Sequence, residues 1–418
     1  MTLQETMRSM GDAAREAARR MATVSTRRKN SALRAMAAAV DTRRDLIKTA
    51  NELDLKAGRQ AGLVPAMLDR LALTDERIDG IIRGLREVAD LPDPVGRCIS
   101  RRRRPNGLII LKQRVPIGVI AIIYESRPNV TADAAALCLK TGNAVILRGG
   151  REAIQSNQAI AEALAIGAAE AGLPEQVVQL VRTTDREAVR ELVQMDDRID
   201  LVIPRGGESL IRTVVELARV PVIKHYKGIC HIFVDESADP DMALPIVENA
   251  KCQRPGVCNA VETLLVHAGI AAAFLPRLAE LAQRRGIEIR ADEAAHAIVP
   301  AFKPATEDDW SAEYLDMILA VRVVDDVGEA IDHINTYGSH HSDAIITRDE
   351  GAARLFGREI DSAAVYVNAS TRFTDGGEFG MGAEMGISTD KLHARGPMGL
   401  EELTTYKYVV QGTGQVRS

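Results

Sequence analysis

The spacing of apolar positions changes character along the chain. Residues 1–90 place alanines and other apolar residues at helical intervals between charged ones, most regularly over 31–50, which predicts a helical lead-in. From residue 108 short apolar runs alternate with amphipathic segments. Strands are expected at 118–124, 144–147, 177–181, 201–203 and 221–223, and helices at 132–140, 156–171, 186–193 and 208–218. This alternation predicts βαβ units and a mostly parallel sheet covered on both faces, an architecture typical of nucleotide-binding domains.

A second α/β unit is expected to begin near residue 253. Its predicted strands are 262–266, 318–324, 344–346 and 365–367, with a helix at 270–284. The fold class is therefore α/β with three parts: a helical lead-in and a nucleotide-type α/β domain over 1–252, a second α/β domain over 253–385, and a C-terminal return and arm over 386–418. The last part ends in a predicted strand at 404–410.

Composition supports more than one domain and argues against some partners. A chain of 418 residues exceeds what one core usually serves, and 46% hydrophobic residues suffice for two or three. Aromatic residues make up only 3% and the net charge is −5, which disfavours nucleic-acid binding. The one basic run, Arg101 to Arg104, is followed at once by the turn Pro105-Asn106-Gly107, so a solvated hairpin is the expected structure.

The cysteines, histidines and termini suggest a protein of a reducing compartment. The cysteines are odd in number and lack the C-x-x-C or Cys/His spacing of a zinc site, and His333, His340 and His341 lack ligand partners nearby in the sequence, so no metal is expected. The N-terminus shows no secretory pattern, and no apolar run approaches the ~20 residues of a membrane helix. We expect a soluble, cytoplasmic protein that binds no membrane.

Cys258 is the candidate nucleophile. It follows the Pro255-Gly256 break and precedes an apolar run, so it is expected at the entrance to a buried strand. A thiolate attacks carbonyl carbon well, and a cation such as Arg254 or Lys251 could lower its pKa. The alternative is a small buried hydrophobe, the role we expect for Cys252.

Two glycine turns are candidates for binding phosphate. The chain has no G-x-G-x-x-G motif, but Arg148-Gly149-Gly150 and Arg205-Gly206-Gly207 each follow a predicted strand. Glycine permits close backbone approach, and a guanidinium suits phosphate. Either turn alone could equally be an ordinary strand-to-helix connection.

Several longer motifs resemble one family. They are R-P-G-V-C-N-A-V-E-T-L-L at 254–265, I-Y-E-S-R-P-N-V-T at 123–131, A-V-I-L-R-G-G at 144–150, Y-V-N-A-S-T-R-F-T-D-G-G at 366–377, and a looser stretch over 324–345. They occur in family order and together span about 20–410. The chain resembles the γ-glutamyl phosphate reductases of the aldehyde dehydrogenase superfamily. This resemblance implies an aldehyde-dehydrogenase-like fold, with a Rossmann-type cofactor domain over 1–252, a catalytic domain over 253–385 and a small oligomerisation arm over 386–418.

The resemblance implies a reaction and roles for named residues. Cys258 would attack L-glutamate 5-phosphate, and NADPH would reduce the resulting thioester to L-glutamate 5-semialdehyde, a step of proline biosynthesis. Asn129 would stabilise the oxyanions, the two glycine turns would hold the adenosine-phosphate end of NADPH, and Asp316 would meet the nicotinamide ribose. Arg127 and Arg372 are candidates for the anionic groups of the substrate, with solvated or structural arginines as the alternative.

The resemblance also implies a difference from water-using relatives and a mode of assembly. Hydrolytic aldehyde dehydrogenases carry a glutamate in a pattern like L-E-L-G-G-K, whereas residues 223–228 here read I-K-H-Y-K-G. Without that base the thioester would be protected from water. The tail would pair with the hairpin at 101–115 to form a homo-oligomer, a dimer or a tetramer, and the kinase that makes the substrate, glutamate 5-kinase, is a possible partner.

Two other functions stay open at this point. A cysteine hydrolase would pair Cys258 with a histidine base, His225 or His341, and would not need a nicotinamide. A non-catalytic scaffold could keep the fold with an unreactive cysteine.

Overall fold

The computed structural model describes residues 1–417, which form two compact units. The first contains Met1–Lys224, Gly380–Gly386 and the chain from Met398 onward, and the second contains His225–Phe379 and Ile387–Pro397. The division after Lys224 corrects the boundary predicted between 252 and 253. The reason is that the strand Cys230–Val234 pairs with strands of the second unit, so the segment before residue 253 folds with that unit.

The predicted helical lead-in is confirmed. Side-chain caps start several of its helices: Thr2 and Glu5 form a reciprocal capping box, and Thr74 accepts from the backbone of Arg77. The helices are α1 (Leu3–Met21), α2 (Thr26–Thr42), α3 (Arg44–Gln60), α4 (Pro65–Leu71) and α5 (Asp75–Asp90). Close packing of α2 on α7 (Ile154–Glu170) depends on Gly167, because a Cβ there would overlap the backbone of Met36.

A parallel sheet with the order β5-β4-β3-β6 forms the core of the first unit. Its central strands β3 and β4 are buried along their whole length, which explains their unbroken apolar sequences. The elements are β3 (Val119–Tyr124), α6 (Val130–Lys140), β4 (Ala144–Arg148), α7, β5 (Val178–Leu180), α8 (Glu187–Gln194), β6 (Leu201–Arg205) and α9 (Glu208–Leu217). The strand predicted at 221–223 is wrong: only a single bridge joins Val222 to Val202, since Pro221 has no N–H for a ladder.

A seven-stranded parallel sheet organises the second unit within the described residues, in the order β10-β9-β11-β8-β7-β12-β13. Helices cover it on both faces, with α10 and α11 over one and α13 and α14 over the other. The strands are β7 (Cys230–Val234), β8 (Val261–His267), β9 (Glu288–Ala291), β10 (Lys303–Pro304), β11 (Ile318–Val324), β12 (Ser342–Ile346) and β13 (Ala364–Val367). The helices are α10 (Pro240–Cys252), α11 (Ala268–Arg285), α12 (Glu293–Ile298), α13 (Val327–Tyr337) and α14 (Glu350–Glu359). The four strands predicted for this unit are confirmed, and β7, β9 and β10 were not predicted.

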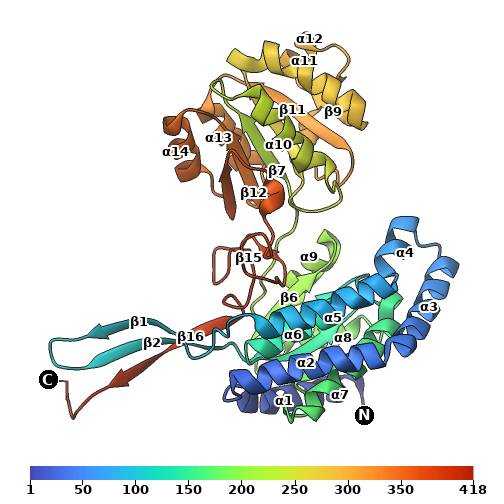
Figure 1. The fold of residues 1–418 in the computed structure, drawn as a ribbon, viewed down its shortest axis with the longest axis vertical. Coiled ribbons are helices and arrows are strands. Elements are labelled where there is room, and N and C mark those ends of the chain that lie inside the picture. The colour runs from blue at the N-terminus through green and yellow to red at the C-terminus, as the bar shows by residue number, and fades with distance from the viewer. Residues whose placement is uncertain (418) are drawn as a thin grey trace. The chain divides into compact units, whose positions relative to one another are not determined.

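A three-stranded antiparallel sheet, β1-β2-β16, makes the arm of the first unit (Figure 1). Its strands are β1 (Cys98–Arg103), β2 (Ile109–Pro116) and β16 (Thr404–Gln411). The tail strand β16 pairs with β2 of the hairpin, with Thr404 opposite Pro116 at one end and Gln411 opposite Ile109 at the other. The pairing expected from the family resemblance thus occurs within one chain. The arginine run lies exposed on β1 and its turn, as predicted. Across residues 1–417 the helices are either too short or too polar to cross a membrane.

Candidate active site

Cys258 lies in the turn that joins α10 to β8, three residues before the strand begins, as predicted from the sequence. The turn closes through a hydrogen bond from the backbone N–H of Ala260 to the carbonyl of Val257, 3.1 Å long. The Cys258 side chain is partly exposed. A strand entrance therefore holds a thiol that solvent and small molecules can reach.

The segment that precedes β7 packs directly against Cys258. A Cβ on Gly228 would overlap the carbonyl oxygen and Cα of Cys258, so only glycine fits there. The N–H of Gly228 donates to Glu313 Oε1 at 2.7 Å, and the N–H of Ile229 donates to Ser339 Oγ at 2.8 Å. Two side chains thus hold the Gly228 segment in place against Cys258.

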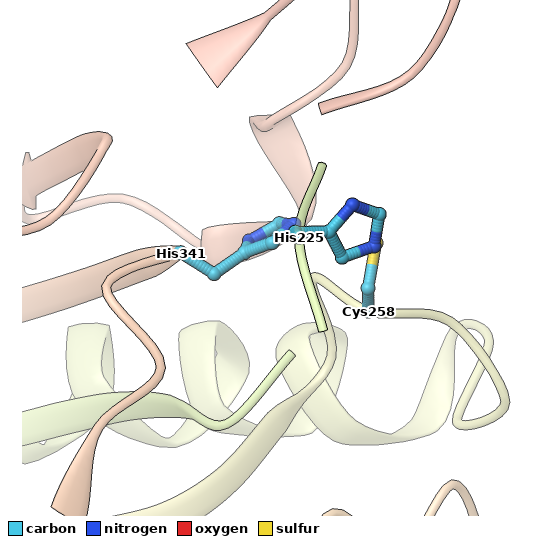
Figure 2. A group of neighbouring side chains, drawn as sticks. All are labelled: His225, Cys258 and His341. Atoms are coloured by element: carbon cyan, nitrogen blue, oxygen red, sulfur yellow. The ribbon is translucent and has the colours of Figure 1, made fainter. Parts of the chain in front are cut away.

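Two imidazoles face the thiol. Ligand atoms of His225, Cys258 and His341 all lie within 4.8 Å of one another, and Figure 2 shows the His225 ring next to the Cys258 sulfur. The two rings meet edge to face with centroids 5.6 Å apart. His225 Nδ1 is 2.8 Å from the carbonyl oxygen of Ile387. Because that oxygen can only accept, Nδ1 carries the proton of the neutral ring and Nε2 keeps its lone pair.

Hydroxyl groups fix the second imidazole. His341 Nδ1 lies 2.8 Å from Ser342 Oγ, which is 2.6 Å from Thr374 Oγ1, and Tyr366 donates or accepts at the same threonine across 2.7 Å. Burial raises the pKa of Tyr366 to about 12, so this chain of hydroxyls stays neutral. The buried chain fixes the orientation of the His341 ring beside the thiol.

The other cysteines of this region have surroundings that disfavour a thiolate. Cys230 is fully buried, and its thiol donates to the carbonyl of Cys258 at 3.2 Å. Burial raises the pKa of the Cys230 thiol well above its usual value and also raises that of Cys252. This agrees with the structural role predicted for Cys252.

An arginine supplies positive charge near Cys258. Arg372, in the short helix η3 (Thr371–Phe373), donates to the Asn259 side-chain oxygen and to Gln253 Oε1, the latter at 2.9 Å. Asn259 in turn donates to the carbonyl of Thr374 at 2.9 Å. Burial, and then the nearby charge of Arg254, lowers the pKa of Arg372, while the Cys258 side chain acts in the opposite sense. Arg372 thus lies close enough to influence an anion at Cys258.

Lys251 does not serve the thiol in the way the sequence allowed. Its Nζ is buried, donates to Glu262 at 2.6 Å and to the carbonyl of Val261 at 3.1 Å, and so is paired with the first residues of β8. This pair anchors the end of α10 to β8, the strand that follows Cys258.

Asn129 and Arg127 lie in the first unit, in the exposed turn that leads into α6. The Asn129 side-chain amide donates to Asp133 Oδ2 at 2.9 Å. Burial raises the pKa of Asp133 to about 6. Ser126 adopts a positive φ of 45°, and its N–H and hydroxyl both donate to Glu152, at 2.6 and 2.8 Å. The turn that carries both predicted residues is therefore strained and held by specific bonds.

The first glycine turn follows β4. Arg148 is only 8% exposed, and its guanidinium donates to the carbonyls of Gly149 at 3.1 Å and Thr184 at 3.3 Å. Burial lowers the pKa of Arg148, and its Nε has no partner among the described residues. A Cβ on Gly149 would overlap the amide of Asn157. The guanidinium in this structure supports the backbone of the turn.

The second glycine turn follows β6, on the other side of β3 from β4. Arg205 is partly exposed, and the carboxylate of Glu125 accepts from the N–H of Gly207 at 3.0 Å, at the start of α9. The carboxyl ends of β3, β4 and β6 share the edge where the strand order reverses, the usual place for a dinucleotide in such sheets. Arg205 and the glycines at the start of α9 are the residues of this edge suited to hold a phosphate, and in this structure the Glu125 carboxylate accepts from the Gly207 N–H.

Asp316 is exposed, and its carboxylate accepts from the N–H of Met317 at 2.7 Å just before β11. Glu313, three residues earlier, is the acid that contacts the nucleophile segment through Gly228. Sequence reasoning missed Glu313, Gly228 and Cys230, because each acts through a contact between distant segments. No local pattern marks such contacts.

Comparison with known proteins agrees with this architecture. The family model "Aldehyde dehydrogenase family" matches residues 2–312. A γ-glutamyl phosphate reductase of Moorella thermoacetica is 58% identical over 411 residues, 98% of each chain, and one of Geobacter metallireducens is 57% identical over 417 residues, 100% of each. The crystal structure of a γ-glutamyl phosphate reductase from Thermotoga maritima matches with a TM-score of 0.97 at 50% identity, over 99% of this chain and 100% of that one. The chain therefore belongs to the aldehyde dehydrogenase family and, within it, to the γ-glutamyl phosphate reductases.

Proposed function

We propose that this protein reduces L-glutamate 5-phosphate to L-glutamate 5-semialdehyde and phosphate in proline biosynthesis, with NADPH as reductant. The observation that carries the proposal is the partly exposed Cys258 in its strand-entrance turn, with Gly228 packed against its backbone and Arg372 nearby. Its full-length relatives with 57–58% identity are γ-glutamyl phosphate reductases, which supports the same substrate here.

The Cys258 thiolate attacks the acyl carbon of the substrate. The carbon–oxygen bond to phosphate breaks, phosphate leaves, and a γ-glutamyl thioester remains on the sulfur. NADPH supplies a hydride to this acyl group when bound. Release of the semialdehyde returns the electron pair to sulfur, so Cys258 is again a thiolate, and the semialdehyde cyclises spontaneously to pyrroline-5-carboxylate.

Asn129 is proposed to stabilise the oxyanion, together with the backbone N–H of Cys258. The side-chain amide has two N–H donors, and one of them already bonds Asp133. That bond orients the carboxamide, and the second N–H is the donor we assign to the oxyanion. Arg127 and Arg372 are proposed to bind the anionic groups of the substrate, Arg372 on the strength of its place beside Cys258.

The nicotinamide dinucleotide is proposed to bind along the carboxyl edge of the first sheet. Its phosphates would lie at the glycine turns, and Asp316 remains a candidate for the nicotinamide ribose. The family resemblance favours Arg148 as the residue that contacts a 2′-phosphate, but Arg148 is buried whereas Arg205 is partly exposed, so we propose Arg205 for this contact. The proposed residues at the two turns are Arg148, Gly149, Gly150, Arg205, Gly206 and Gly207.

A cysteine hydrolase is the second candidate, and one observation favours it: both His225 and His341 lie next to the thiol. Either could in principle activate water. The chain belongs with the γ-glutamyl phosphate reductases, and residues 223–228 contain no glutamate that could act as a base. Both facts favour reduction over hydrolysis, because a reductase must keep water away from the thioester. Phosphate release without NADPH distinguishes the two candidates.

The arm is the proposed oligomer contact, in a dimer or a tetramer. Its tail strand exposes Tyr406, Tyr408 and Val410, at 49%, 61% and 55%, which is unusual for an isolated edge strand. We further propose a cytoplasmic location and transfer of the unstable substrate from glutamate 5-kinase.

A coupled assay tests the proposed function. The protein is mixed with glutamate, ATP, a glutamate 5-kinase and NADPH, and NADPH oxidation is followed. Oxidation that requires both the kinase and ATP is the expected result, and its absence would refute the proposal.

A further inference from the structure

The cluster of His225, Cys258 and His341 has the composition of a soft-metal site. The described residues contain one group of histidine, cysteine or acidic side chains that meets the geometry of metal ligation, and this is it. Thiolate and imidazole ligands select Zn²⁺ over Mg²⁺ or Ca²⁺. The three ligands come from three segments: the strand approach before β7, the α10–β8 turn, and the residue just before β12.

We propose that these three side chains form a Zn²⁺-binding site that holds the enzyme in an inactive state. In a tetrahedral zinc site with Zn–N near 2.1 Å and Zn–S near 2.3 Å, ligand atoms are about 3.4–3.7 Å apart. The three ligand atoms here lie within 4.8 Å of one another, close to the spacing that this geometry requires. A fourth position stays open for water.

The outer contacts of both imidazoles suit this role. Zinc-bound histidines usually donate their second N–H to a carbonyl or other acceptor, which fixes the ring and the tautomer. His225 Nδ1 donates to the carbonyl of Ile387, and His341 Nδ1 lies 2.8 Å from Ser342 Oγ. In His225 Nε2 is then the ligand atom, and in His341 Nε2 is the ligand atom when Nδ1 donates to Ser342. Figure 2 shows the His225 ring next to the Cys258 sulfur.

The consequence for catalysis rests on the proposed role of Cys258. On binding, the thiol loses its proton to solvent, and the sulfur electron pair is donated to Zn²⁺ instead of to an acyl carbon. A bound metal therefore blocks thioester formation. Removal of the metal restores the nucleophile without any change in oxidation state.

Binding is measured on the full-length protein without substrate, after EDTA treatment and dialysis. Co²⁺ serves as the spectroscopic probe and Zn²⁺ as the competitor and calorimetric ligand. The expected results are a thiolate-to-cobalt charge-transfer band that Zn²⁺ abolishes, and loss of that band in Cys258→Ser. His225→Gln and His341→Gln should each weaken Zn²⁺ binding roughly a hundredfold or more.

Control variants separate the site from other metal-binding groups. Cys252→Ala and His296→Ala remove a thiol and an imidazole of the same unit outside the cluster, and both should bind Zn²⁺ like the parent. His341 is buried, so Ser342→Ala provides a milder change, expected to weaken binding about 10- to 100-fold. Circular dichroism confirms that each variant is folded.

The outcomes distinguish the metal site from the proposed function. Unchanged Zn²⁺ affinity in both glutamine variants, or a cobalt spectrum without the thiolate band, would overturn the site. Reductase activity of the EDTA-treated enzyme is a separate readout. If that activity is present and sensitive to Cys258→Ala, the function stands whatever the metal result; if it is absent while zinc binds as expected, only the function fails.

Discussion

The thiol of Cys230 donates a hydrogen bond to the backbone carbonyl of Cys258 across 3.2 Å, so one cysteine lies directly behind another. The two differ in environment. Cys230 is fully buried at the start of β7, whereas Cys258 is partly exposed. Burial raises the pKa of Cys230 and keeps it a thiol, so the group that supports the backbone of Cys258 does not itself become a reactive thiolate.

Cys258→Ala is expected to lower kcat for reduction by roughly a thousandfold or more, because no other group can form the thioester. Cys252→Ala is the matched control and should keep most of the activity, since the Cys252 side chain only packs on the core. Measurement of kcat for both variants, with iodoacetamide labelling of Cys258, checks this. Equal losses in the two variants would contradict the assignment of the nucleophile.

Gly228→Ala should impair both folding and catalysis, because the added Cβ would overlap the backbone of Cys258. Overpacking of this kind costs about 1–3 kcal/mol. Gly357 on α14 is the control, since a Cβ there would meet nothing within 4 Å, and Gly357→Ala should leave stability unchanged or raise it by up to about 1 kcal/mol. Denaturant unfolding and kcat measured on both variants decide the matter. A Gly228→Ala enzyme with parental stability and kcat would show that the contact is not required.

Much of the fold follows from local pattern, and the site follows only in part. The strand at 119–124 can be predicted because its residues form an unbroken apolar run, and all of them are buried. The position of Cys258 can be predicted because it stands at the break before another buried strand. β9 has alternating charged and apolar residues, and β10 is two residues long, so neither has a pattern strong enough to predict. The contacts of Gly228 with Cys258 and of Glu313 with Gly228 join segments distant in sequence, so they depend on the register of the sheet and leave no local signal.

Without NADPH, the enzyme mixed with its acyl phosphate should release about one equivalent of phosphate per active site and then stop. The physical reason is that 223–228 carry no carboxylate to activate water against the thioester. A rapid-quench phosphate assay measures the burst. Continued release at the initial rate would show that a histidine beside Cys258 activates water, and would favour the hydrolase. Repeating the assay with His225→Gln and His341→Gln identifies which ring is responsible.

Arg205→Ala should weaken NADPH binding by about ten- to a hundredfold and leave NADH nearly unaffected, because a charge-assisted bond to the 2′-phosphate is lost. Arg148→Ala should instead reduce folding stability by about 1–3 kcal/mol, since its guanidinium supports the carbonyls of Gly149 and Thr184. Dissociation constants for both nucleotides, with thermal unfolding of each variant, separate the roles. If Arg205→Ala weakens both nucleotides alike, the arginine contacts the pyrophosphate; if it weakens neither, the assignment is wrong.

The carboxyl group of Asp133 should make stability fall as pH rises. Burial raises its pKa from 3.8 to about 6 in the folded protein, so the folded state binds the proton more tightly than the unfolded chain. The stabilisation is complete below the unfolded pKa and is lost as pH rises through the folded pKa. Asp133→Asn keeps the shape and removes the titration. Between about pH 5 and pH 8 the parent should therefore lose about 1 kcal/mol of unfolding free energy relative to the Asp133→Asn variant. Chemical denaturation at several pH values measures this difference, and a difference that does not vary with pH would show that Asp133 is already ionised in the folded protein at about pH 5.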